Sequence, residues 1–279
     1  TSVDSDIERG LYGGADSLRL AITHSRLTGR LADMIYSMEA TNTDFLAYQF
    51  KPVLNLLDSP SDGILIADEV GLGKTIEAGL IWTELRARED ARKLLIVSPA
   101  VLREKWQLEL KRRFGVRSDV VNADALQATL RSVERGEEHE FALIASMQGL
   151  RPSREWEDEE IDTASARLAR YLEDAKSSAP LFDLIVIDEA HYLRNESSQT
   201  YQLGKLLRPV TKQLVFLSAT PIHLGSKDLF NLLNIIDAEN FRYPSSFDDV
   251  LKANSPLINL ADAFRKGGVE KSKALQVIE

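Results

Sequence analysis

The chain has 279 residues, of which 44% are hydrophobic and 28% charged, and its formal net charge is −9. This is ordinary globular composition, and the length allows one large domain or two modest ones. The absence of cysteine excludes disulfides and thiolate metal sites, the acidic balance argues against coating nucleic acid through bulk charge, and no apolar run approaches membrane-spanning length.

Residues 1–44 carry early glycine turns and then a helical pattern over residues 18–38, so we expect a helical N-terminal leader. Gln49 follows, ahead of a short helical segment at 53–57. A glutamine amide supplies both the donor and the acceptor that an adenine edge needs. A surface glutamine at a helix start is the commoner case, but the position of Gln49 before the next motif favours adenine recognition.

The central stretch covers residues 64–81. An apolar run at 64–67 predicts a buried strand, and it is followed by a glycine turn and then by Lys74 and Thr75 at the start of a helical pattern. A glycine turn at a helix N-terminus brings backbone N–H groups to a phosphate, Lys74 would bridge the β and γ phosphates, and Thr75 would bind Mg²⁺. An ordinary helix cap is the alternative. Asp68 stands where the generic phosphate loop has glycine, yet the flanking strand and helix favour nucleotide binding.

Further along, apolar runs at 94–97, 120–121 and 141–145 predict strands, with helices expected at 101–114 and 124–134. Residues 151–180 are polar and acidic, with a helix expected at 163–176. We interpret this stretch as an acidic surface insertion whose default role is to be solvated.

The strongest strand pattern, at 184–187, runs into Asp188 and Glu189. Carboxylates at a strand end lie where α/β folds bind ligands, so Asp188 would hold Mg²⁺ and Glu189 would orient and deprotonate the attacking water. A last strand at 214–217 precedes a helix at 227–236 and an irregular aromatic tail. Apolar strands that alternate with helices predict one α/β domain with a mainly parallel central sheet flanked by helices in three layers.

The order of five segments resembles the first lobe of the superfamily-two helicases, and within them the Swi/Snf translocases and their RapA-like bacterial branch. The segments are Tyr48-Gln49, DEVGLGKT (68–75), SPAVLREKW (98–106), DEAH (188–191) and LSATP (217–221). The resemblance implies a RecA-like P-loop lobe at 45–245, followed by a helical tail at 246–279 that leads towards a second lobe. It also implies ATP and Mg²⁺ as cofactors, duplex DNA as partner, a possible larger protein complex, no membrane, and a cytoplasmic, nucleoid-associated location.

The resemblance assigns roles to individual positions. Catalysis falls to Lys74, Asp188 and Glu189, with Mg²⁺ at Thr75 and Asp188. The nucleotide would contact Gln49, Asp68, Gly71, Leu72, Gly73, Lys74, Thr75 and Ile76. Coupling of the ATP state to lobe movement would use His191, Ser218, Ala219 and Thr220. The nucleic-acid backbone would be touched at Ser98, Pro99, Ala100, Ser146 and Gln148.

Family members carry a second lobe whose arginines reach the γ-phosphate, and no second lobe fits after Thr220. We therefore expect this chain alone to bind ATP weakly and to hydrolyse it very slowly. Two alternatives remain: a DEAH-type helicase that separates RNA or DNA strands, and a nucleotide-dependent scaffold lobe that binds a partner protein. A phosphate-loop kinase or transporter ATPase ranks last, because it explains neither LSATP nor Gln49.

Overall fold

Six parallel strands form the centre of the computed structural model, which describes residues 46–59, 61–67, 71–176, 179–219, 226–249 and 251–253. Their order across the sheet is β1-β6-β5-β2-β4-β3, and every neighbouring pair is parallel. The strands are β1 (Gly63–Ile66), β2 (Lys93–Ser98), β3 (Asp119–Val121), β4 (Phe141–Ser146), β5 (Phe182–Ile187) and β6 (Thr211–Leu217). The expected parallel sheet is confirmed.

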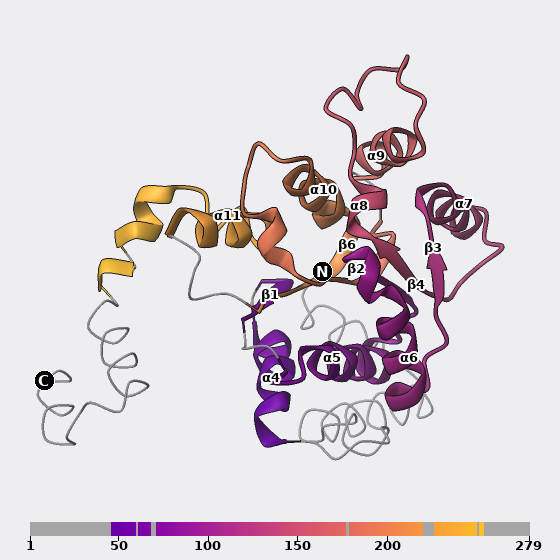
Figure 1. Cartoon of the computed structure of the whole chain (residues 1–279). Coiled ribbons are helices and arrows are strands. Elements are labelled where there is room, and N and C mark those ends of the chain that lie inside the picture. Colours follow the sequence, from indigo (N-terminus) through magenta and orange to yellow (C-terminus); the bar gives the residue numbers. More distant parts are fainter. Residues whose placement is uncertain are drawn as a thin grey trace, which may run out of the picture.

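Helices cover both faces of this sheet, which gives three layers (Figure 1). On one face lie α4 (Lys51–Asp58), α5 (Lys74–Glu89) and α6 (Arg103–Phe114). On the other face lie α7 (Ala123–Glu134), α8 (Met147–Leu150), α9 (Ala164–Ala175), α10 (Gln199–Leu207) and α11 (Ser226–Ile236). Short 3₁₀ turns connect several elements: η1 (Ala47–Phe50), η2 (Ala100–Leu102), η3 (Ala190–Leu193) and η4 (Arg208–Val210).

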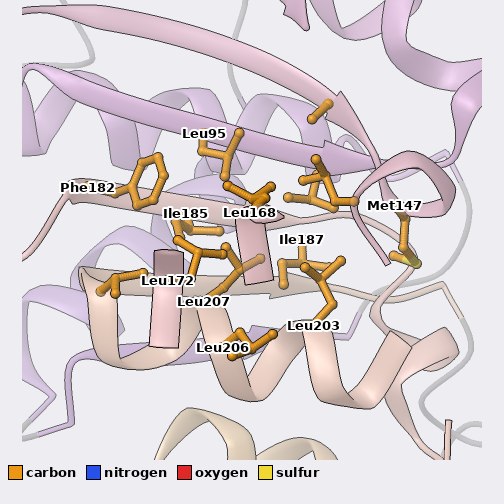
Figure 2. Close-up of a cluster of buried hydrophobic side chains, with 14 of the residues drawn as sticks. Leu95, Met147, Leu168, Leu172, Phe182, Ile185, Ile187, Leu203, Leu206 and Leu207 are labelled. Carbon is orange, nitrogen blue, oxygen red and sulfur yellow. The ribbon is translucent and has the colours of Figure 1, made fainter. Parts of the chain in front are cut away.

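The inner strands β2, β4, β5 and β6 are mainly apolar because each one contributes side chains to two hydrophobic cores. In β2, Leu95 and Val97 pack into the core under α7 to α11, and Leu94 and Ile96 pack into the core under α4 to α6. Successive side chains of a strand point to opposite faces, so a sheet that is covered twice needs unbroken apolar runs. Figure 2 shows the first of these cores, where Ile185 and Ile187 of β5 meet leucines of α9 and α10.

The carboxyl ends of the strands meet at one edge of the sheet. Two backbone bonds extend the ladder just past the strand ends: the Asp188 N–H donates to Val97 O at 2.8 Å, and the Ser218 N–H donates to Ile66 O at 2.9 Å. The segment that follows β6 therefore lies beside the end of β1, and the segment that follows β5 lies beside the end of β2. Motifs that are far apart in the sequence share this edge.

The acidic stretch at 151–180 differs from its interpretation as a solvated insertion. Its helix α9 buries Ala166, Leu168, Ala169, Leu172 and Ala175 in the core above the sheet. An exposed ion pair between Arg167 and Asp124, 2.8 Å long, also connects α9 to α7. The helical half of this stretch is therefore part of the domain core. The acidic residues before it are exposed, while Pro152 and Trp156 among them are buried.

The aromatic tail is also more ordered than expected. Residues 244–249 are helical, and Phe247 is buried against Phe230 of α11, with a ring-centroid distance of 5.8 Å. Packing of this apolar ring on α11 accounts for the ordered segment that follows α11. The leader at 1–44 and most of the tail at 246–279 fall outside the described residues, so the domain boundaries stay predictions.

Candidate functional site

The glycine turn sits between the end of β1 and the start of α5. Gly71 and Gly73 have φ angles of +91° and +94°, a region that glycine enters without strain. Gly73 is also constrained by space, because a Cβ there would lie 2.5 Å from the Gln49 Nε2 atom. α5 begins at Lys74 without a side-chain cap, and the Ile76 and Glu77 N–H groups donate to Gly73 O at 2.7 and 3.0 Å, which forms the first turn of the helix. Asp68 lies outside the described residues.

Gln49 is buried and fastened to this turn. Its Nε2 donates to Leu72 O at 3.3 Å, and its Oε1 accepts from Leu46 N–H at 3.2 Å. The Tyr48 hydroxyl donates to the same Leu72 oxygen at 2.9 Å. Sequence reasoning expected an adenine contact here and missed this structural role of Gln49 and Tyr48. The position of these two residues in the sequence, shortly before the glycine turn, was the signal that could have indicated this role.

Asp188 stands just past β5 and is only 9% exposed. Its Oδ2 accepts from the Trp106 Nε1–H at 2.9 Å, and its Oδ1 accepts from the Glu189 N–H at 2.9 Å. Across the described residues, no basic side chain lies within ion-pair distance of this carboxylate. Buried charges are normally compensated, so the arrangement suits a cation. The sequence placed Trp106 in the core and gave no sign of this bond.

Glu189 and His191 follow in an unusual backbone turn. Glu189 has φ +53° and ψ +45°, a left-handed conformation that costs an L residue on the order of 1 kcal/mol. Its Oε2 lies 3.1 Å from the His191 Nδ1, a contact at ion-pair distance but without hydrogen-bond alignment. The His191 ring also packs on Tyr192, with a centroid distance of 4.3 Å. The turn thus brings Glu189 and His191 together.

The segment after β6 reaches the same edge. Ser218 is buried, and its N–H continues the ladder to β1 as described above. Ala219 is partly exposed, and Thr220 lies outside the described residues. The structure therefore places Ser218 and Ala219 beside the strand that leads to the glycine turn. The coupling role of these residues stays a prediction.

The nucleic-acid candidates separate into exposed and buried groups. Ala100 and Gln148 are exposed and in contact, since the Ala100 N–H donates to Gln148 Oε1 at 3.2 Å. Ser146 is partly exposed and caps α8 by accepting from the Gly149 N–H. Ser98 is 0% exposed, and its contact with nucleic acid stays a prediction.

Val101 is a further exposed residue in the segment that follows β2. It is 86% exposed and stands between Ala100 and Leu102 in η2, directly before α6. Single exposed apolar side chains are common on protein surfaces, so Val101 alone is no evidence of a contact.

The chemistry of the donor set fits a magnesium nucleotide. Thr75 in the first turn of α5 and Asp188 offer oxygen ligands, which Mg²⁺ prefers, and Lys74 and the N–H groups of the turn offer positive charge to phosphates. The described residues hold no group of three or more His, Asp or Glu side chains able to coordinate a metal ion on their own. Any Mg²⁺ here would therefore take part of its coordination from phosphate oxygens and water.

The parallel sheet with helices on both faces defines a RecA-like α/β domain. The sequence model of the SNF2-related domain matches residues 35–277. The chain belongs to the SNF2-related domain family.

Individual relatives agree with this assignment. RNA polymerase-associated protein RapA of Vibrio cholerae is 30% identical over 207 residues, and the RapA of Photobacterium profundum is 31% identical. Each match covers 73% of this chain and 20% of the relative, so the chain spans about a fifth of their length. The RapA-like resemblance is thereby confirmed at the level of the family.

A solved structure supports the fold independently. The Sulfolobus solfataricus SWI2/SNF2 ATPase core in complex with dsDNA aligns with a TM-score of 0.52 and 20% identity, over 86% of this chain and 43% of that chain. At this identity the likeness supports the RecA-like fold alone. Every helix in the described part of the chain is too short or too polar to cross a membrane.

Proposed function

We propose that this chain is the ATP-binding first lobe of a DNA-dependent ATPase of the Swi/Snf type. It would bind Mg-ATP and, when paired with a second RecA-like lobe, hydrolyse it to move along duplex DNA. One observation carries the proposal: the glycine turn before α5 and the buried carboxylate of Asp188 lie at the same edge of the sheet. Among the described residues, Asp188 has no cationic partner.

Each residue has a task in this proposal. Lys74 and the backbone N–H groups of Gly71 to Ile76 hold the phosphates, and Thr75 and Asp188 hold Mg²⁺. Bound Mg²⁺ would neutralise charge on the phosphate oxygens. Glu189 orients the attacking water and accepts its proton, while His191, at 3.1 Å from Glu189, can respond to the state of that carboxylate. Gln49 holds the turn through Leu72 and would contact adenine with its remaining donor and acceptor capacity.

Duplex DNA is the proposed track. Support comes from the printed description of the SWI2/SNF2 core, which was solved with dsDNA, and from the exposed surface formed by Ala100, Val101 and Gln148. Backbone amides can position phosphates without a basic surface, so an acidic lobe can still bind DNA locally. The RapA relatives are named as RNA polymerase-associated, and we include a larger protein complex and a cytoplasmic, nucleoid-associated location in the proposal.

Nucleotide binding is tested with a fluorescent ATP analogue on the 279-residue chain. Lys74→Ala should weaken binding by roughly 10-fold or more, because it removes a charge-assisted phosphate contact. Lys111→Ala, which alters an exposed lysine of α6, is the matched control and should bind as the wild type does. Equal affinities for Lys74→Ala and wild type would overturn the proposal.

The track is tested by equilibrium binding of the same chain to short duplex DNA and to single-stranded RNA, with and without ATP. Tighter binding to the duplex supports a translocase. A preference for single strands would favour a strand-separating helicase. No binding to either, combined with full function of Glu189→Gln in the natural protein, would favour a nucleotide-dependent scaffold.

A further inference from the structure

We propose that Trp106 is a positioning residue for Asp188, and that it connects the exposed segment at residues 99–102 to the proposed Mg²⁺ site. The proposal rests on the function proposed above and deepens it. The Trp106 indole is 2% exposed, and its N–H donates to Asp188 across 82 residues of sequence.

The indole orients the carboxylate without neutralising it. An indole N–H is a donor that carries no charge, so Asp188 keeps its full negative charge for a cation. The Glu189 N–H takes the other oxygen, so each oxygen accepts one bond and the carboxylate plane is fixed. Carboxylate oxygens have further lone pairs, and these stay available to Mg²⁺ or to its water shell. Donors that hold a metal ligand in this way commonly tune metal affinity.

The connection to the surface is short. Trp106 lies in the first turns of α6, which begins at Arg103 directly after η2. The Leu102 N–H donates to Pro99 O at 2.9 Å and closes the exposed turn that carries Val101. Protein interiors are close-packed, so a displacement of this turn would move the indole as well. A molecule bound at residues 99–102 would thereby act on the orientation of Asp188.

The chain supplies its own control. Trp82 of α5 is also 2% exposed, and its Nε1 has no hydrogen-bond partner in the described structure. Trp106→Phe and Trp82→Phe therefore remove similar buried volumes, but only the first removes a bond to Asp188. A difference between the two variants reports the bond rather than the loss of packing.

The first measurement is an NMR experiment on the metal-free chain. Trp106→Phe and Trp82→Phe serve in it only to assign the indole signals. The chain has 3 tryptophans, so its ¹H–¹⁵N spectrum should contain three indole signals, which the two variants assign. In Asp188→Ala, which removes the acceptor, the Trp106 indole signal should shift and exchange faster with solvent, while the Trp82 signal stays in place. An unchanged Trp106 signal would overturn the inference.

The second measurement is ATP-analogue affinity as a function of Mg²⁺ concentration. Trp106→Phe should need roughly 10- to 100-fold more Mg²⁺ for half-maximal binding, with unchanged affinity in the absence of Mg²⁺. Trp82→Phe should keep the wild-type Mg²⁺ requirement. If Trp106→Phe keeps the wild-type Mg²⁺ dependence, the inference about Trp106 is overturned while the proposed function stands. If the wild type binds no ATP analogue at all, the proposed function fails and the inference falls with it.

Discussion

Strand β5 has an aspartate near each of its ends, and both side chains are buried to a similar degree. Asp183 at the amino end is 6% exposed, and Asp188 past the carboxyl end is 9% exposed. Asp183 lies where the parallel strands begin, which we call the amino edge, and Asp188 lies where they end, which we call the carboxyl edge. Their partners differ in charge, and this difference separates the part of the molecule that stabilises the fold from the part that we propose binds a ligand.

Asp183 is compensated. Its Oδ2 accepts from the backbone N–H groups of Arg92 and Lys93 at 2.8 and 2.9 Å, and its Oδ1 meets Lys212 Nζ at 2.7 Å. Burial alone would raise the pKa of this carboxyl, but the bonds from Lys212, Arg92 and Lys93 outweigh burial and hold the pKa below its ordinary value. The group ties the starts of β2, β5 and β6 together.

Asp188 is held by neutral donors only. The indole of Trp106 and the backbone of Glu189 fix its direction but leave its charge uncompensated among the described residues. A buried carboxylate without a cation is unfavourable for the free protein. In the proposed function the same carboxylate binds a metal ion, so the carboxyl edge would exchange stability for ligand binding.

The largest expected effect is on stability, at the amino edge. Asp183→Ala leaves two buried backbone N–H groups without acceptors, so we expect the free energy of unfolding to fall by about 3 kcal/mol. Urea unfolding followed by circular dichroism measures it. ATP-analogue affinity of the folded protein should not change. Asp58→Ala, at an exposed aspartate of α4, is the control and should cost less than about 0.5 kcal/mol.

Asp188→Asn should show the opposite pattern. We expect the Mg²⁺-dependent part of ATP-analogue affinity to fall on the order of 100-fold, which is about 2.7 kcal/mol, because the carboxylate charge is lost. The free energy of unfolding should change by less than about 1 kcal/mol, because the amide can still accept from Trp106. A loss of stability as large as that of Asp183→Ala, with Mg²⁺ dependence intact, would contradict the contrast between the two edges.

The pH dependence of stability sharpens the comparison. Because the pKa of Asp183 is lower in the folded protein than in the unfolded chain, its contribution is complete above the ordinary aspartate pKa of about 3.9. That contribution is lost as pH falls through the folded-state value.

The stability difference between wild type and Asp183→Asn should therefore be constant from about pH 7 to 5 and shrink below about pH 4. Urea unfolding at a series of pH values measures it. Other carboxyls whose pKa is lowered, such as Asp237, are common to both proteins and cancel. A difference that grows on acidification would contradict the assignment.

Much of the fold could be predicted from the sequence because a parallel sheet with two covered faces needs unbroken apolar runs. The runs around Leu95, Ile185 and Val215 are short, strong and bounded by turns, and each one is a strand. The carboxyl ends of parallel strands lie at one edge, so the positions of the glycine turn and Asp188 directly after strand patterns were enough to predict that both lie there.

The contacts that join these pieces could not be predicted. The bond between Trp106 and Asp188 depends on how α6 crosses the sheet, and a tryptophan at helical spacing predicts only burial. The motif that contains Ser98 gives no measure of exposure, and Ser98 is the buried last residue of a central strand. The polar composition around α9 hid the apolar face that begins at Ala166.

The smallest expected effect concerns Lys212. Its side chain is 49% exposed, so solvent screens its attraction to Asp183, and the backbone N–H groups of Arg92 and Lys93 remain when the lysine is removed. Lys212→Met should therefore lower the free energy of unfolding by only about 0.5–1 kcal/mol, measured by urea unfolding.

Added salt separates this cost from lost packing. If the cost is electrostatic, it should diminish at about 1 M NaCl, where the Debye length is about 3 Å. A cost that equals that of Asp183→Ala and persists in salt would mean that the lysine, rather than the backbone, anchors the amino edge. In that case the main difference between the two residues would be that Asp183 has a cationic partner and Asp188 has none. The missing cation at Asp188 would then be a stronger reason to expect a metal ion there.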